Sequence, residues 1–181
     1  MLMAIVFLLQ AAQILEPYTL REDQGLATKV VLKNGLTVIV REQQAVPLTS
    51  ITTYVKAGYF DEEDRISGIS HVIEHMFFKG TSKRPVGEIA RQTQALGGYL
   101  NAYTYYDRTV YHTEVPAENM KQALEIQADA LWNSVYDAEE LKQEIEVVLQ
   151  ENNRKLDNPP AVASEKLYET AFEQHRMKRW R

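Results

Sequence analysis

The order of strand-like and helix-like segments constrains the fold of this chain more than any other feature. Val30–Val40 alternates around Asn34-Gly35, the pair preferred in a type I′ turn, and therefore predicts a β-hairpin. Leu48–Val55 is rich in β-branched residues and predicts a third strand. Tyr99–Val115 contains two further strand-like runs. The chain thus begins with strands and returns to them after a helical region.

Helical patterns occupy most of the remaining sequence. Apolar residues recur at helical spacing in Gly68–Phe78, and Val86–Leu96 predicts a second short helix that ends at a glycine pair. Asp137 is a suitable N-cap for a later helix. The three later helices are predicted at Ala117–Asn133, Ala138–Leu156 and Ala163–Gln174. This order predicts an α+β fold, a two-layer sandwich in which a mainly antiparallel sheet packs against helices.

Residues 1–16 are separate from the predicted domain, which covers residues 17–181. Met1–Leu15 is almost uninterrupted apolar sequence and is too short for a transmembrane helix. It matches the hydrophobic region of a signal peptide, with Ala11 and Ala12 near a cleavage point, although no Lys or Arg precedes it. The alternative is an apolar arm that packs on the domain. A signal peptide predicts a periplasmic or secreted protein, and an arm predicts a cytoplasmic one.

Charge and cysteine content exclude several classes of protein. The formal net charge of -5 argues against a nucleic-acid binder, because such proteins carry a basic surface. The sequence contains no cysteine, which excludes both a disulfide framework and a thiolate zinc site. Any bound metal must therefore be held by His, Asp and Glu side chains.

One helical segment carries the clearest sign of chemistry. His71 and His75 are four residues apart, so their imidazoles lie on one helix face and can bind one metal ion. Zinc in catalytic sites takes three protein ligands and a water, and it lowers the pKa of that water to about 7. Glu74 can reach such a water without binding the metal. The segment predicts one zinc ion with Glu74 as general base; two chance histidines on a surface helix are the alternative.

The third ligand must come from another element. Glu144 and Glu151 are seven residues apart, and this spacing places them on one face of the predicted helix 138–156. Val147 and Val148 lie between them, so this face is partly apolar. Two such carboxylates suggest one metal ligand and one supporting group, and position alone does not decide which is which. A glutamate-rich face that is merely solvated is the alternative.

Four blocks of this sequence resemble the pitrilysin/insulinase family of zinc metallopeptidases, which includes insulin-degrading enzyme and the mitochondrial processing peptidase. The blocks are Lys33–Glu42, Ser67–Thr81, Leu96–Pro116 and Glu144–Asn152, and they occur in the family's order and spacing. They extend through most of the chain. The resemblance implies the fold of the family's N-terminal peptidase domain.

The resemblance also implies roles for particular residues. His71 and His75 match the zinc-binding histidines, and Glu151 lies where the family places its third ligand. Glu74 matches the general base, and Glu144 matches the supporting acidic residue. Asn101 and Ala102 match positions of an edge strand, Leu100–Thr104, that binds peptide backbone. His112 and His175 are interpreted as a structural and a solvent-exposed residue, respectively.

Length is the one departure from the family's pattern. Active members combine at least two homologous domains, in one chain or in separate subunits, and this sequence ends at Arg181, within what resembles the first domain. The resemblance therefore implies an incomplete domain, a second homologous domain or subunit as partner, and a peptide or small protein as substrate. The expected function is zinc-dependent peptide hydrolysis. The alternative is a non-catalytic peptide-binding subunit, or an inactive fragment that binds zinc and needs a second half.

Overall fold

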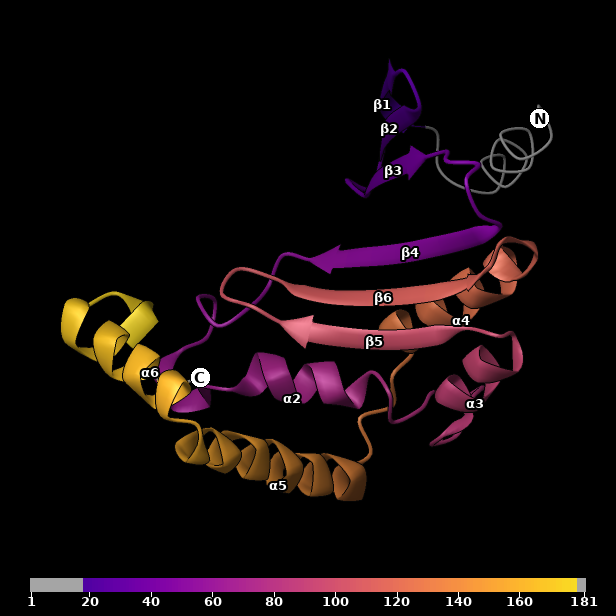
Figure 1. Ribbon diagram of the computed structural model, residues 1–181. Helices are drawn as coiled ribbons and strands as arrows, with labels where there is room; N and C mark the ends of the chain where they lie inside the picture. Colours follow the sequence, from indigo (N-terminus) through magenta and orange to yellow (C-terminus); the bar gives the residue numbers. More distant parts are fainter. Residues whose placement is uncertain (1–17, 179–181) are drawn as a thin grey trace. The chain divides into compact units, whose positions relative to one another are not determined.

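The computed structural model describes residues 18–178, and Figure 1 shows their helices and strands. The signal peptide or apolar arm expected at residues 1–16 lies outside the described residues. The chain divides into two compact units, of which the first ends at Val46 and the second begins at Pro47. The interpretation of residues 17–181 as one domain stays a prediction.

The first unit contains three antiparallel strands in the order β1 (Tyr18–Gln24), β2 (Ala27–Leu32) and β3 (Thr37–Arg41). The hairpin predicted around Asn34 is confirmed, but its predicted type I′ turn is wrong. That turn needs positive φ at both central residues, whereas only Gly35 has it, at +88°.

The loop is instead one residue longer than a type I′ turn. The Leu32 N–H donates to the carbonyl of Leu36, and the Gly35 N–H donates to the carbonyl of Leu32. A turn with negative φ at its centre followed by a left-handed glycine closes a three-residue hairpin loop in this way. The sequence pair Asn-Gly suits both turns, so the pair alone does not distinguish them.

The second unit is built on a sheet in the order β4 (Leu48–Val55), β6 (Thr109–Pro116) and β5 (Tyr99–Thr104). All neighbours in this sheet are antiparallel, as predicted. Placing β6 between the other two strands leaves β5 at one edge of this three-stranded sheet (Figure 1).

Five α-helices complete the second unit and confirm the α+β prediction. They are α2 (Ile69–Met76), α3 (Glu88–Ala95), α4 (Met120–Trp132), α5 (Ala138–Arg154) and α6 (Pro159–Ala171). Short 3-10 turns occur at Asp64–Ile66, Ala117–Asn119, Lys155–Asp157 and Arg176–Lys178. Asp137 caps α5 as predicted, because its side chain accepts from two backbone N–H groups of the first turn. Within residues 18–178, no helix is long and apolar enough to cross a membrane.

Two of these helices begin differently from the prediction. The segment from Ala117 starts with a 3-10 turn, and the α-helix begins only at Met120. The last helix was expected from Ala163, but α6 begins at Pro159. Its start is earlier because Asn158 accepts from the Ala161 N–H and proline is tolerated in the first turn, where a backbone N–H has no helical partner.

Two apolar clusters hold the second unit together. The larger one joins strand β6 to the helices α3 and α4 and to the end of α2, through Phe77, Ile89, Tyr111, Ile126 and Ala130. The smaller one consists of Val72 and Met76 on α2 and Val148 on α5. Each Val, Ile, Phe or Met side chain among them contributes about 1.5–3 kcal/mol when fully buried. The smaller cluster fixes α2 beside α5, as Figure 1 also shows, and this pairing positions the polar residues described next.

Candidate metal centre

Helix α2 is anchored at its N-terminus by a carboxylate from outside the helix. Glu62 is 3% exposed, and its two oxygens accept from the backbone N–H groups of Gly68 at 2.8 Å and Ser70 at 2.9 Å. The first N–H groups of a helix lack partners within it, and the positive end of the helix dipole favours a negative charge there. Glu62 therefore fixes the start of the helix that carries both histidines.

Replacing Glu62 by Ala is expected to lower the free energy of unfolding by about 1–3 kcal/mol, because two backbone donors lose their acceptor. Urea denaturation of the metal-free chain measures this loss. Glu63→Ala is the matched control, since the Glu63 side chain is exposed and forms a surface ion pair with Arg65, and it should change stability by less than about 0.5 kcal/mol. Equal losses in the two variants would show that the Glu62 cap contributes nothing specific.

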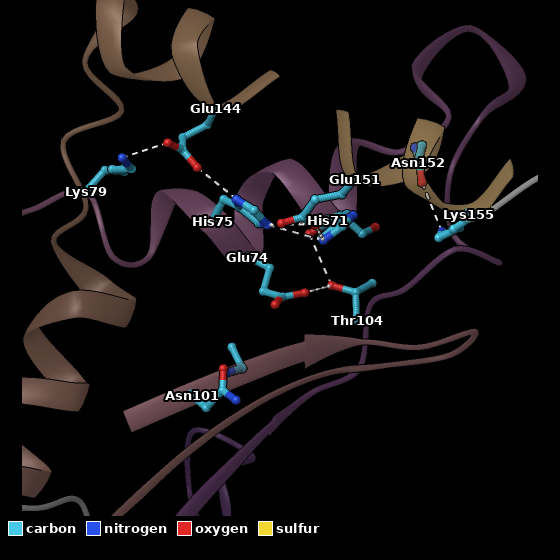
Figure 2. A network of polar contacts seen from close by, with 12 residues as sticks. His71, Glu74, His75, Lys79, Asn101, Thr104, Glu144, Glu151, Asn152 and Lys155 are labelled. Carbon is cyan, nitrogen blue, oxygen red and sulfur yellow. Dashed lines mark hydrogen bonds and ion pairs between the residues drawn. The ribbon is translucent and has the colours of Figure 1, made fainter. Parts of the chain in front are cut away.

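The two histidines of α2 meet a glutamate of α5. The Nε2 atoms of His71 and His75 lie 3.2 Å apart. Glu151 Oε2 lies 3.5 Å from His71 Nε2 and 3.7 Å from His75 Nε2. The structure thus brings together the three residues expected as ligands, and Figure 2 shows their side chains converging.

These separations fit one zinc ion. Two ligand atoms that each lie 2.0–2.1 Å from a tetrahedral zinc are about 3.3 Å from each other. The three observed separations, between 3.2 and 3.7 Å, lie close to this value. Two imidazole nitrogens and one carboxylate oxygen are also a donor set that catalytic zinc sites use. The Glu151 side chain is 40% exposed, so the group is open to solvent on one side, as a catalytic site requires.

Glu144 supports the site from behind His75. Its Oε2 atom accepts a hydrogen bond from His75 Nδ1 at 2.8 Å, and a carboxylate can only accept. His75 Nδ1 is therefore the donor in this contact, and Nε2 is the ring atom on the side of His71 and Glu151. Burial acts to raise the pKa of Glu144, but hydrogen bonds from Lys79 and His75 outweigh it and hold this pKa below its usual value.

Glu74 lies beside the three converging groups without joining them. Its Oε2 atom accepts from the hydroxyl of Thr104, at the end of β5, at 2.6 Å, and Figure 2 shows the two side chains pointing toward each other. Burial raises the pKa of Glu74 above its usual 4.5, while the hydrogen bond from Thr104 acts in the opposite direction. Burial also lowers the pKa of His71 below 6.5, and the neighbouring His75 lowers it further. Near pH 7 the His71 ring is therefore neutral, as metal binding requires.

A pocket of about 500 Å³ unites these groups with the edge strand. Asn101 and Ala102 line it together with the metal-site residues and Glu74, so the structure gathers all the residues expected at the site. His112 pairs with Asn101 across β5 and β6 and does not line this pocket. His175 is exposed, as expected, and its ring contacts Phe60.

Five further residues line the pocket: Tyr59, Phe78, Lys79, Tyr103 and Thr104. Tyr103 and Thr104 lie in the strand expected to bind peptide backbone, and the sequence gave no separate role to any of the five. Phe78 and Lys79 lie just after the end of helix α2. Their nearness in sequence to His71 and His75 could have marked them as candidates for the site. The contact of Thr104 with Glu74 could not be predicted, because it joins residues that are 30 positions apart.

Comparison with known proteins identifies the class of protein that this fold and site define. A family model described as insulinase, peptidase family M16, matches residues 37–180. The chain belongs to this family. A crystal structure of a protease from Helicobacter pylori has the same fold, with a TM-score of 0.79 and 28% sequence identity over 88% of this chain and 38% of that one.

Curated relatives match over most of this chain. An uncharacterized zinc protease of Rickettsia felis is 40% identical over 141 residues, which are 78% of this chain and 34% of that protein. A protein of Arabidopsis thaliana named as a probable mitochondrial-processing peptidase subunit beta is 34% identical over 142 residues, 78% of this chain and 27% of that one. The chain thus spans about a quarter to a third of the length of these relatives.

Proposed function

We propose that this chain is the metal-binding part of a zinc-dependent peptidase. His71, His75 and Glu151 would hold one zinc ion, and Glu74 would act as general base. The observation that carries the proposal is the convergence of two imidazole nitrogens and one carboxylate oxygen at separations of 3.2–3.7 Å. The names of the relatives support zinc as the metal, because those of Rickettsia felis and Bacillus subtilis are each named as an uncharacterized zinc protease.

The residues of the chain have separate tasks in this reaction. A bound zinc ion would polarise the peptide carbonyl and lower the pKa of water, so that water could lose a proton and act as the nucleophile near neutral pH. Glu74 takes the proton from the attacking water and passes it to the leaving amine, which completes the cleavage of the C–N bond. Thr104 fixes the Glu74 carboxylate through its hydroxyl. Glu144 holds the His75 ring so that Nε2 faces the other ligands.

A peptide or small-protein substrate suits the edge strand beside the pocket. Within the described residues strand β5 pairs with β6 on one side only, so the backbone groups along its other side could pair with an extended peptide. Asn101 and Ala102 of this strand line the same pocket as Glu74. A peptide paired with β5 would therefore place one of its carbonyls near the general base.

A second homologous domain or subunit is part of the proposal. The chain covers about a third of its zinc-protease relative, and several relatives are named as subunits of the mitochondrial processing peptidase. The rest of the peptide-binding surface would then come from this second part.

Zinc titration and peptide cleavage test the proposed function together. The metal-free chain is expected to bind one zinc ion. Mixed with the part of the Rickettsia felis relative that it does not cover, it should cleave an unstructured peptide, and a chelator should stop the cleavage until zinc is restored. A chain that binds no zinc contradicts the proposal at its first step. One zinc without cleavage in this mixture would favour a non-catalytic subunit.

A further inference from the structure

Lys79 contacts Glu144, the residue that holds the His75 ring, and has no role in the function proposed above. It follows α2, and its ammonium group is 2.6 Å from Glu144 Oε1 and 3.4 Å from Glu140 Oε2. Its side chain is 24% exposed, whereas that of Glu144 is 8% exposed. The shorter of the two contacts is therefore largely shielded from solvent, where a charge-assisted hydrogen bond is strongest.

The two oxygens of Glu144 have different partners. Lys79 donates to Oε1, and His75 Nδ1 donates to Oε2, as the dashed lines of Figure 2 show. With both oxygens engaged, the carboxylate cannot rotate without breaking a charge-assisted hydrogen bond. The plane of the carboxylate in turn sets the direction of the His75 ring, and so the direction in which Nε2 points.

We propose that Lys79 is a positioning residue for zinc binding, which acts on His75 through Glu144. The proposal rests on the zinc site proposed above and adds a residue to it. Without Lys79, the buried Glu144 carboxylate keeps one partner and can turn, so the His75 ring is no longer held in one orientation. Groups that orient a metal-binding histidine typically change metal affinity by 10–100-fold when they are lost.

Two simpler roles for Lys79 predict different results. As a purely structural ion pair between the end of α2 and α5, it would affect the stability of the metal-free protein but not the zinc affinity of the folded chain. As a positive charge near the metal, it would weaken zinc binding by repulsion, so its removal would tighten binding. Only a positioning role predicts weaker zinc binding that depends on Glu144.

The experiment measures zinc affinity of the full chain by competition with a chromophoric chelator, with zinc as the only added ligand. Lys79→Met should weaken zinc binding about tenfold, and Lys79→Arg, which keeps a donor cation, should recover most of this loss. Lys83→Met is the matched control, because Lys83 is an exposed lysine shortly after Lys79, and it should leave the affinity unchanged. In a Glu144→Ala background, Lys79→Met should cause no further loss.

The outcomes separate this inference from the function on which it rests. A wild-type chain that does not bind zinc overturns the proposed function itself. If the wild-type chain binds zinc and the Lys79→Met variant binds it equally or more tightly, only the role of Lys79 is overturned. An additive loss in the Glu144→Ala background overturns it as well. If Lys79→Met does not fold, as judged by urea denaturation of the metal-free protein, Lys79→Gln replaces it, with a loss of the same order expected.

Discussion

Replacing Glu74 by Gln is expected to abolish nearly all peptide cleavage while zinc stays bound. Gln has almost the same shape but cannot take a proton from the attacking water, and general-base catalysis typically contributes 10²–10⁴-fold to a rate. We expect kcat to fall by about this factor. Glu74 is not one of the three converging ligand residues, so zinc affinity should stay within a few-fold of wild type.

A stability measurement separates this loss of activity from unfolding. Burial raises the pKa of Glu74, which means that the folded protein disfavours its charged form. Stability due to this group is fully present below its unfolded pKa and is lost as the pH rises through the higher folded pKa. At pH 7 the neutral Gln should therefore leave the metal-free protein at least as stable as wild type.

Cleavage that survives Glu74→Gln would exclude Glu74 as the base.

The local part of the site could be predicted from sequence because helical periodicity alone determines it. His71 and His75 are one turn apart, and the structure places their Nε2 atoms together as the spacing requires. The strands that were predicted formed for a similar reason, since alternation and β-branched residues act within a few positions, whereas strand β1 was not predicted. The two failures at Asn34 and at Pro159 also concern local structure. At Asn34 two types of turn suit the same residues, and at Pro159 two starting points of the helix do.

The roles of the two glutamates could not be derived from their spacing. Both lie on the face of α5 that meets α2, but Glu151 reaches His71 while Glu144 reaches the far side of His75. This difference depends on how the two helices are offset along their axes, and the cluster around Val148 fixes that offset. Family resemblance suggested the assignment, and the packing of α2 on α5 gives its physical basis.

Contacts between segments that are distant in the sequence could not be predicted from sequence patterns. Asp129 is buried, yet it accepts hydrogen bonds from Thr81 at 2.7 Å and from Arg84 at 2.5 Å, across more than 40 positions of the chain. Lys79 and Glu144 are 65 positions apart in the sequence and form an ion pair in the fold. In the sequence each of these residues looks like an ordinary charged residue. Its burial and its bonding partner are determined only when the helices pack together.

The second large effect is expected at Glu151, the third ligand of the proposed metal site. Glu151→Ala removes the carboxylate that lies 3.5 and 3.7 Å from the two imidazole nitrogens, and leaves zinc with two protein ligands. Loss of an outer group alone costs 10–100-fold in metal affinity, so loss of a direct ligand should weaken zinc binding by more than about 100-fold. Cleavage should disappear with the metal.

Two other glutamates of helix α5 serve as the control for Glu151→Ala and as the alternative ligand. Glu146 is exposed on α5, and Glu146→Ala should leave zinc affinity unchanged in the same chelator competition. Glu144→Ala should weaken binding less than Glu151→Ala does, because Glu144 contacts the Nδ1 side of His75 and not the converging Nε2 atoms. If the Glu144 variant loses more zinc than the Glu151 variant, the two glutamates have exchanged roles and the proposed ligand set is wrong. If neither variant loses zinc, the metal does not bind between α2 and α5.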